Sequence, residues 1–307
     1  MIAVKKKVVY EAFGLKIASS CPLPELSESI EQATPDVEIV MGDLTDLWSR
    51  LAVPNERFVV KDTFVMFHIE DTVTFLIECG TSITISPKTG ADEGKIRLYL
   101  LGTCMGVLLM QRKVLPLHGS AIVIDRQVYA VIGDSGAGKS TLASAFLQRG
   151  YSLVSDDVIA VSLTEGNALA VTPAYAQQKL WQESLQAFGM ETDKYRPVFD
   201  REKKYSVPVR SQFSSEPLPL AGIFVLQKTE NSEIECQLVP KFERLQMLFD
   251  HTYRNFLLSP LGLMDWHFHI NSAVSDKIDV YHLLRPISRF TAHELVSYIL
   301  KRLKGAT

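Results

Sequence analysis

The strongest chemical signal in the chain is a glycine-rich segment that matches G-x-x-x-x-G-K-[ST] at every fixed position. It consists of Gly133, Asp134, Ser135, Gly136, Ala137, Gly138, Lys139 and Ser140, followed by Thr141. Glycines let the backbone wrap closely around an anion with its N–H groups pointing inward, and a following helix adds its positive end. The segment therefore predicts an ATP phosphate site in which Lys139 reaches the outer phosphates and the Ser140 hydroxyl ligates Mg²⁺.

The context of the glycine-rich segment suits this chemistry. Short apolar strands are expected at residues 120–124 and 128–132, joined by a turn at Asp125-Arg126, and a helix is expected from residue 139 to 149. In that helix Leu142 and Phe146 have the i,i+4 spacing of a packed face. A strand before the loop and an amphipathic helix after it are what phosphate binding requires; the alternative is a glycine-rich turn with no ligand.

Two adjacent carboxylates, Asp156 and Asp157, follow a short strand predicted at residues 151–155. If that strand were parallel and next to the phosphate loop, it would end beside the terminal phosphate. One carboxylate could then hold Mg²⁺ and the other could accept the proton of an attacking hydroxyl. The short distance from Lys139 argues against motors, translocases and G proteins. A solvated acidic turn is the alternative.

A histidine and a group of basic residues are further candidates for the same site. His118 precedes the first strand of the core and would lie near the phosphates if that strand neighbours the loop strand. Lys204 belongs to a basic run from which one side chain could fold over the nucleotide and neutralise transition-state charge, and Lys179 has a similar status. The alternatives are a structural histidine and a solvated loop. The other members of the basic run are Arg201, Lys203 and Arg210.

His267 and His269 could form a metal pair if they alternated along a strand, but no third ligand is apparent. The four cysteines contain no C-x-x-C pair, which argues against a thiolate metal site.

Composition narrows the class of protein. The chain has 307 residues, is 47% hydrophobic and carries a net charge of -3, so bulk charge gives no reason to expect nucleic acid or acidic membranes as partners. The N-terminus lacks the apolar stretch of a signal peptide, and the longest apolar run, around residues 98–110, is too short to cross a bilayer. We expect a cytoplasmic protein without a membrane segment.

The pattern of elements predicts two domains, a small β-rich (α+β) module at residues 1–95 and an α/β kinase domain at residues 96–307. Strands are expected in the module at residues 8–13, 37–41, 58–69, 73–78 and 81–86. After it we expect helices at 96–113, 176–188, 241–257 and 291–304, a polar loop with some extended structure at 196–211, and strands at 152–155, 158–163, 168–171 and 220–227.

With these motifs in place, the chain resembles the HPr kinase/phosphorylase group. The resemblance covers residues 118–163 and rests on Leu117-His118-Gly119-Ser120-Ala121, on the glycine-rich segment, and on Val154-Ser155-Asp156-Asp157. It implies a P-loop nucleotide-binding core like that of phosphoenolpyruvate carboxykinase. It also implies Asp156 as the base toward a seryl hydroxyl, Ser140 and Asp157 near Mg²⁺, and His118 as a supporting catalytic group. The chain departs from the family in two places. The glycine-containing signature that follows the aspartates and is linked to reverse phosphorolysis is replaced by Val171-Thr172-Pro173-Ala174-Tyr175, and a Pro-Gly-Arg-Asn-like stretch is missing after residues 207–210.

Other segments look like the shorter HPr-kinase-like proteins encoded beside lasso-peptide genes. These are Tyr10-Glu11-Ala12-Phe13-Gly14-Leu15, Pro22-Leu23-Pro24-Glu25-Leu26, Lys179-Leu180-Trp181 and residues 200–205. The resemblance implies an ATP-dependent kinase acting on the C-terminal serine of a ribosomal precursor peptide, and it leaves a homo-oligomer open. Two alternatives remain: a kinase of a free small molecule such as an amino acid, and a non-enzymatic nucleotide-sensing module.

Overall fold

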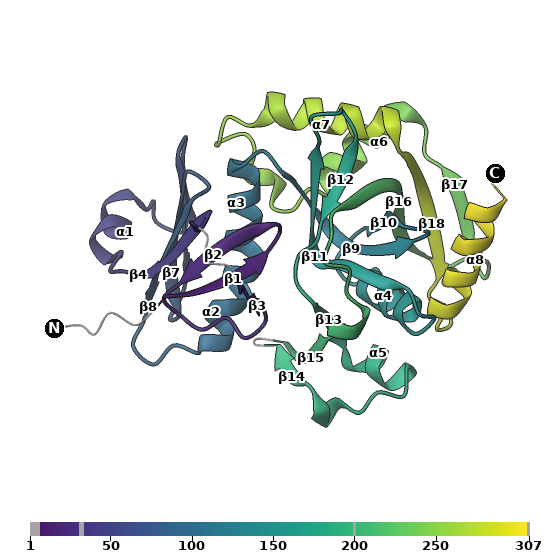
Figure 1. Cartoon of the computed structure of the whole chain (residues 1–307), viewed down its shortest axis with the longest axis horizontal. Coiled ribbons are helices and arrows are strands. Elements are labelled where there is room, and N and C mark those ends of the chain that lie inside the picture. Colours follow the sequence, from purple (N-terminus) through teal and green to yellow (C-terminus); the bar gives the residue numbers. More distant parts are fainter. Residues whose placement is uncertain (1–6, 31–33, 199–200, 306–307) are drawn as a thin grey trace. The chain divides into compact units, whose positions relative to one another are not determined.

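A computed structural model of the protein describes residues 7–30, 34–198 and 201–305 (Figure 1). It is a mixed α/β structure, as predicted, with two compact units. The first unit comprises Met1–Pro116 with Arg254–His267, and the second comprises Leu117–Tyr253 with Phe268–Thr307. Compact packing units need not coincide with domains, so the predicted division between residues 95 and 96 stays a prediction. Within the described residues, no helix has the length and apolar character needed to span a membrane.

The first unit is built on an eight-stranded sheet in the order β3-β1-β2-β4-β8-β7-β6-β5. Its strands are β1 (Val8–Ala12), β2 (Leu15–Ser19), β3 (Ser27–Glu28), β4 (Val37–Met41), β5 (Phe58–Lys61), β6 (Phe64–Ile69), β7 (Val73–Glu78) and β8 (Ser82–Pro87). The helical segments are α1 (Thr45–Leu51), α2 (Glu93–Tyr99), the π-helical η1 (Leu100–Cys104), α3 (Met105–Gln111) and the short η4 (Asn255–Leu257). The strand predicted at residues 58–69 is two strands, because Asp62 and Thr63 form a turn that pairs β5 with β6 as a hairpin.

The second unit contains a seven-stranded sheet in the order β10-β9-β11-β12-β16-β18-β17, with an additional pairing between β10 and β16. Because β10 pairs with both β9 and β16, five of the strands form a closed circuit of pairings. The bounds are β9 (Leu115–Ile124), β10 (Gln127–Ile132), β11 (Ser152–Leu163), β12 (Leu169–Thr172), β16 (Leu218–Thr229), β17 (Glu235–Leu238) and β18 (Asp279–Pro286).

A second, three-stranded sheet and several helices complete this unit. The small sheet has the order β13 (Gln177–Trp181), β15 (Arg201–Pro208), β14 (Arg196–Val198). The helices are α4 (Lys139–Leu147), α5 (Gln182–Ala187), α6 (Lys241–Asp250), α7 (Met264–Lys277, which begins in the first unit) and α8 (Ala292–Lys304), with short helical turns η2 (Thr192–Lys194) and η3 (Arg210–Gln212). Side chains of α4, α8 and the large sheet share one apolar core, which includes Leu142, Phe146, Phe224, Leu283 and Leu295. This core holds the N-terminus of α4 against the sheet.

Several predictions of secondary structure after residue 95 are wrong, including the helix at 241–257, which ends at Asp250. Residues 176–188 are not one helix, since the first part is the strand β13 and only α5 is helical. The segment 196–211 is mostly the β14–β15 pair rather than a loop. His267 and His269 lie in α7 rather than on a strand, and His267 is buried while His269 is exposed, so they do not form the metal pair that alternation would give. Residues 177–181 contain too few β-branched and aromatic residues to reveal a strand, and their pairing partner β15 lies elsewhere in the chain.

A close backbone approach at Gly119 fixes how β9 and β10 pair. Gly119 lies opposite Ile132, the last residue of β10. A Cβ atom built on Gly119 would lie 2.3 Å from the carbonyl oxygen of Val131, a backbone atom that cannot rotate away. Only glycine therefore lets the two strands come together at the start of the phosphate loop.

We predict that Gly119→Ala lowers the free energy of unfolding by about 2 kcal/mol, because the new methyl group forces the two backbones apart. Urea unfolding measures this. Gly166→Ala is the matched control, since the nearest atom to a Cβ there is a side-chain oxygen 3.9 Å away and the residue is exposed. Equal stability of the two variants would contradict the prediction.

Candidate active site

The glycine-rich segment connects the end of β10 to the start of α4, so the predicted strand–loop–helix order is present. Lys139, the first residue of α4, is buried, and its Nζ donates hydrogen bonds to the carbonyl oxygens of Gly133 at 2.7 Å and Asp134 at 3.0 Å. Burial lowers the pKa of the Lys139 ammonium to about 8, against the opposing effect of Asp156. The Lys139 ammonium is therefore hydrogen-bonded to carbonyl oxygens of its own loop.

Arg285, at the end of β18, contacts the glycine-rich loop although it is far from the loop in the sequence. Its Nε donates to the carbonyl oxygen of Ala137 at 2.6 Å. Gly138 has a φ of 106°, and a Cβ there would lie 3.3 Å from that same Nε, so glycine is favoured on both conformational and steric grounds. Sequence reasoning missed Arg285 because 148 positions separate it from Ala137 and no local pattern marks it.

Asp156 and Asp157 lie inside the long strand β11, not after the end of a strand as predicted. The strand β11 also does not neighbour the loop strand β10, because β9 lies between them. Asp157 has a φ of 87°, in the left-handed region that non-glycine residues rarely adopt. Successive side chains of a regular strand point to opposite faces, and this irregular backbone allows both carboxylates to line one pocket.

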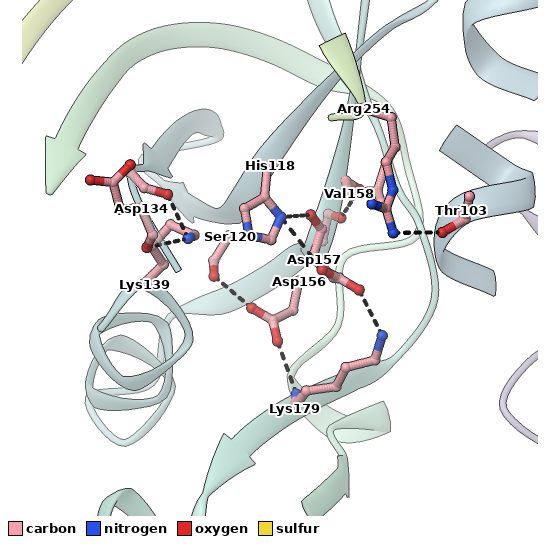
Figure 2. Close-up of polar contacts among 12 residues, drawn as sticks. Thr103, His118, Ser120, Asp134, Lys139, Asp156, Asp157, Val158, Lys179 and Arg254 are labelled. Carbon is pink, nitrogen blue, oxygen red and sulfur yellow. Dashed lines mark hydrogen bonds and ion pairs between the residues drawn. The ribbon is translucent and has the colours of Figure 1, made fainter. Parts of the chain in front are cut away.

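The Asp156 carboxylate is buried and held from two sides (Figure 2). Its Oδ1 accepts a hydrogen bond from the Ser120 hydroxyl at 2.5 Å, and its Oδ2 accepts one from the backbone N–H of Lys179 at 2.9 Å. Each carboxylate oxygen has a further lone pair, so Asp156 keeps acceptor capacity toward the pocket.

The Asp157 carboxylate forms an ion pair with the side chain of the same lysine. Lys179 Nζ lies 2.6 Å from Asp157 Oδ2, and the two side chains are only 13% and 22% exposed. Burial alone would raise the pKa of the Asp157 carboxyl, but the Lys179 ammonium outweighs it and lowers that pKa well below its usual range. Burial alone would lower the pKa of the Lys179 ammonium, but Asp157 outweighs it and raises that pKa above its usual range. The pair therefore stays ionised.

His118 lies on β9 beside these carboxylates, and its backbone N–H donates to the carbonyl oxygen of His251 at 2.8 Å. Its Nδ1 is 3.0 Å from the carbonyl oxygen of Asp157. A carbonyl oxygen only accepts, so Nδ1 must carry a proton in this contact. Burial lowers the pKa of His118 despite the neighbouring Asp157, which favours the neutral ring with an unprotonated Nε2.

A single pocket of about 340 Å³ in the second unit contains most of the predicted site residues. Its lining includes His118, Ser135, Gly136, Gly138, Lys139, Ser140, Thr141, Asp156, Asp157, Lys179 and Lys204. Among the described residues, Gly133, Asp134 and Ala137 belong to the loop but do not line the pocket, and neither do Lys203 and Arg210. The side chain of Arg201 lies outside the described residues.

The pocket also contains residues that sequence reasoning did not assign. They are Gly119, Leu142, Trp181, Glu183, Ser184, Arg285, Arg289, Phe290, Thr291, Ala292 and Leu295. Lys204 lies over the ring of Trp181 with its Nζ 5.6 Å from the ring centroid. Most of these residues come from β13, α5 and the region around the start of α8, whose approach to the loop depends on tertiary packing.

The donor atoms in the pocket fit Mg²⁺. The Ser140 hydroxyl and the carboxylates of Asp156 and Asp157 supply only oxygen ligands, which hard cations prefer. The described residues contain no cluster of three or more His, Cys, Asp or Glu side chains placed to hold a metal. Mg²⁺ in nucleotide sites commonly uses one or two carboxylates with phosphates and water, so such a cluster is not required.

We predict that Lys179→Met lowers the free energy of unfolding by about 3 kcal/mol, because it leaves the buried Asp157 charge without its partner. The second substitution Asp157→Asn should restore much of that loss, since it removes the unpaired charge. Chemical denaturation measures both variants at neutral pH.

Lys241→Met is the matched control, because the Lys241–Asp276 pair is 3.2 Å long but 66% and 71% exposed and should contribute little. If Lys179→Met were no more destabilising than Lys241→Met, Asp157 would not depend on the lysine for its charge.

Comparison with known proteins finds similarity to HPr kinase/phosphorylases over part of the chain. No family model matches. The HPr kinase/phosphorylase of Mycoplasmopsis pulmonis is 36% identical over 77 residues, which are 24% of this chain and 25% of that protein. The protein of the same name from Treponema pallidum (strain Nichols) is 40% identical over 53 residues, 17% of each chain.

A solved structure, the Hpr(Ser) kinase/phosphatase from Coxiella burnetii, is matched over 62% of this chain and 99% of that one, with a TM-score of 0.34 and 17% identity. The matched segments span about a quarter or less of the length of the curated relatives. Over these segments the sequence of the chain is similar to that of HPr kinase/phosphorylases.

Proposed function

We propose that this protein is an ATP-dependent kinase that transfers the γ-phosphoryl group to a serine hydroxyl. The supporting observation is that the phosphate-loop lysine Lys139 and the buried carboxylate Asp156 line the same pocket. A phosphate loop alone indicates only nucleotide binding. A carboxylate in the same pocket, with acceptor capacity left, adds the group that an attacking alcohol needs. The partial similarity to HPr kinase/phosphorylases points in the same direction.

The loop amides and Lys139 would bind the phosphates of ATP, and Asp156 would act on the acceptor. As the serine oxygen forms its bond to the γ-phosphorus, the bond from that phosphorus to the bridging oxygen breaks and ADP leaves. The hydroxyl proton passes to the Asp156 carboxylate. The hydrogen bonds from Ser120 and from the backbone of Lys179 would keep Asp156 aimed at the acceptor.

The other residues would neutralise charge and orient the reacting groups. Mg²⁺, held by Ser140 and Asp157, would offset the negative charge of the phosphates. Lys179 balances Asp157, so the second carboxylate does not disturb the first. Lys204 would approach the phosphates from the small sheet. His118, neutral and fixed through Nδ1, would support the reaction by orienting the serine beside Asp156.

For the acceptor, we propose the C-terminal serine of a ribosomal, lasso-type precursor peptide, acted on in the cytoplasm. The support is the resemblance of Tyr10–Leu15, Pro22–Leu26 and Lys179–Trp181 to peptide-tailoring kinases. A free small molecule such as serine is the competing acceptor. Incubating labelled ATP with a peptide that ends in serine and, separately, with free serine distinguishes the two, and labelling of free serine alone would rule out the peptide.

We predict that Asp156→Asn lowers the rate of phosphoryl transfer at least about 100-fold, because the amide cannot take up the proton. Nucleotide affinity should change little, since the amide is similar in size. Single-turnover transfer from labelled ATP and calorimetric titration measure the two properties. Near-normal transfer by the variant would refute the assignment of the base. Glu216→Gln is the control, because Glu216 is exposed and does not line the pocket.

We predict that nucleotide affinity falls about tenfold between pH 7 and pH 9, because the ammonium of Lys139, whose pKa is about 8, must be charged to bind phosphate. The sign follows from binding: phosphate stabilises the charged form, so affinity is full below pH 8 and is lost as the pH rises above it. Lys139→Arg should remove this dependence, since arginine stays charged. A flat profile in the unchanged protein would contradict the prediction.

A further inference from the structure

The pocket extends well beyond the groups that phosphoryl transfer uses. Besides the loop and the carboxylates, it is lined by the first turn of α4, the start of α5 and the segment that leads into α8. This second part, which we call the α8 side, consists of Thr141, Leu142, Glu183, Ser184, Arg289, Phe290, Thr291, Ala292 and Leu295. Apart from Thr141, which directly follows the glycine-rich segment, these residues are not part of the predicted phosphate site or of the proposed reaction.

The geometry of phosphoryl transfer indicates which part of the nucleotide would lie on the α8 side. The attacking and leaving oxygens lie on opposite sides of the transferred phosphorus. Asp156 and His118 lie on the acceptor side, so the leaving group and the nucleoside attached to it must extend the other way. In a loop of this type the α- and β-phosphates lie against the amides that lead into the helix. Thr141 and Leu142, which follow Ser140 in α4, line the α8 side and continue in that direction.

The chemistry of the α8 side suits a flat aromatic heterocycle. Phe290 is 46% exposed and is fixed by an edge-on contact with Phe188, with ring centroids 5.4 Å apart. Ala292 and Leu295 are buried and give an apolar floor. The hydroxyls of Thr141 and Ser184 lie 2.8 Å apart and, with Glu183, supply polar groups for the edge of a base.

The aromatic side chains of Trp181 and Phe290 both line the pocket, and they differ in what contacts their rings. The ammonium of Lys204 lies over the ring of Trp181. Phe290 lies next to Arg289, whose guanidinium is held by Glu294 at 2.9 Å and by the carbonyl oxygen of Ser232 at 2.5 Å. The edge-on contact with Phe188 and the start of α8 at Ala292 hold Phe290 in place. A rigid aromatic surface next to a phosphate site is a base-stacking platform.

We propose that the α8 side is the nucleobase subsite and that the ring of Phe290 stacks on the base. The proposal rests on the proposed function, because it assumes that a nucleotide phosphate occupies the loop. It also assigns to Phe290 the contact by which the protein would bind a nucleotide more tightly than a polyphosphate without a base. Stacking alone accepts any base, so preference between adenine and guanine would come from Glu183 and the hydroxyl pair.

The test compares a nucleotide with a polyphosphate that has no base. Calorimetry gives the dissociation constants of a non-hydrolysable ATP analogue, the corresponding GTP analogue and inorganic tripolyphosphate, with Mg²⁺ present. We expect Phe290→Ala to weaken the binding of at least one nucleotide analogue about tenfold or more and to leave tripolyphosphate binding within about twofold. Phe290→Tyr should keep nucleotide affinity, because the aromatic face remains.

Two further variants keep the test decisive. Phe290→Leu preserves apolar packing on Phe188 without an aromatic face, and should show the same selective loss even if Phe290→Ala is unstable. Phe242→Ala removes a phenylalanine that is 80% exposed and outside the pocket lining, and should change nothing.

The possible outcomes separate this inference from the proposed function. Equal weakening of nucleotide and tripolyphosphate by the Phe290 variants, or no weakening of either, would overturn the base subsite. Lys139→Ala should weaken all three ligands. If it weakened none, the phosphate site itself would be wrong, whereas a normal Lys139→Ala result with no effect at Phe290 would reject the base subsite alone.

Discussion

Two adjacent carboxylates in the interior of a sheet need hydrogen-bond and charge partners to offset their burial, and at Asp156-Asp157 one residue supplies two of these partners. Lys179 gives its backbone N–H to Asp156 and its ammonium to Asp157. Both contacts come from β13, a strand of the small sheet, so the packing of β13 against β11 supplies partners to both carboxylates. The charge balance of the pocket therefore depends on the position of the small sheet, because without β13 both carboxylates would lose their contacts with Lys179.

The strand order of the large sheet places His118 and Ser120 of β9 beside the two carboxylates. Because β9 pairs with β10 on one side and neighbours β11 on the other, its residues reach both the phosphate loop and the carboxylates. His118 and Ser120 are two positions apart and so share a face of β9. One contacts the carbonyl oxygen of Asp157 and the other the carboxylate of Asp156. A shift of the register by one residue would turn both side chains away from the acids.

The sequence was sufficient to predict the parts of the site that are local in the chain. The glycine-rich segment requires its flanking strand and helix, and both were found with nearly the predicted bounds. The positions of Asp156 and Asp157 could not be derived in the same way. A pair of aspartates suggests the end of a strand, and only tertiary contacts from Ser120 and Lys179 make it stable inside β11.

Residues that are distant in the sequence could not be predicted at all. Arg285 and Phe290 reach the pocket from the end of β18 and the start of α8, and no periodicity or motif sets them apart from other residues of their type. The helix predicted over residues 176–188 failed for a related reason, because its first half pairs with β15, which follows it by more than 20 positions, and a partner at that distance overrides local propensity.

The loop is held in shape by contacts within the protein, and this determines what binding must change. Arg285 bonds to the carbonyl of Ala137 at the end of the loop, while Lys139 bonds to the carbonyls of Gly133 and Asp134 at its start. With both ends fixed, little backbone entropy is left to lose when phosphate binds. What must move is the Lys139 ammonium, which exchanges two neutral carbonyl partners for a charged phosphate. A hydrogen bond to a charged acceptor is the stronger one, so this exchange favours the bound state and places the pH dependence of binding on a single side chain.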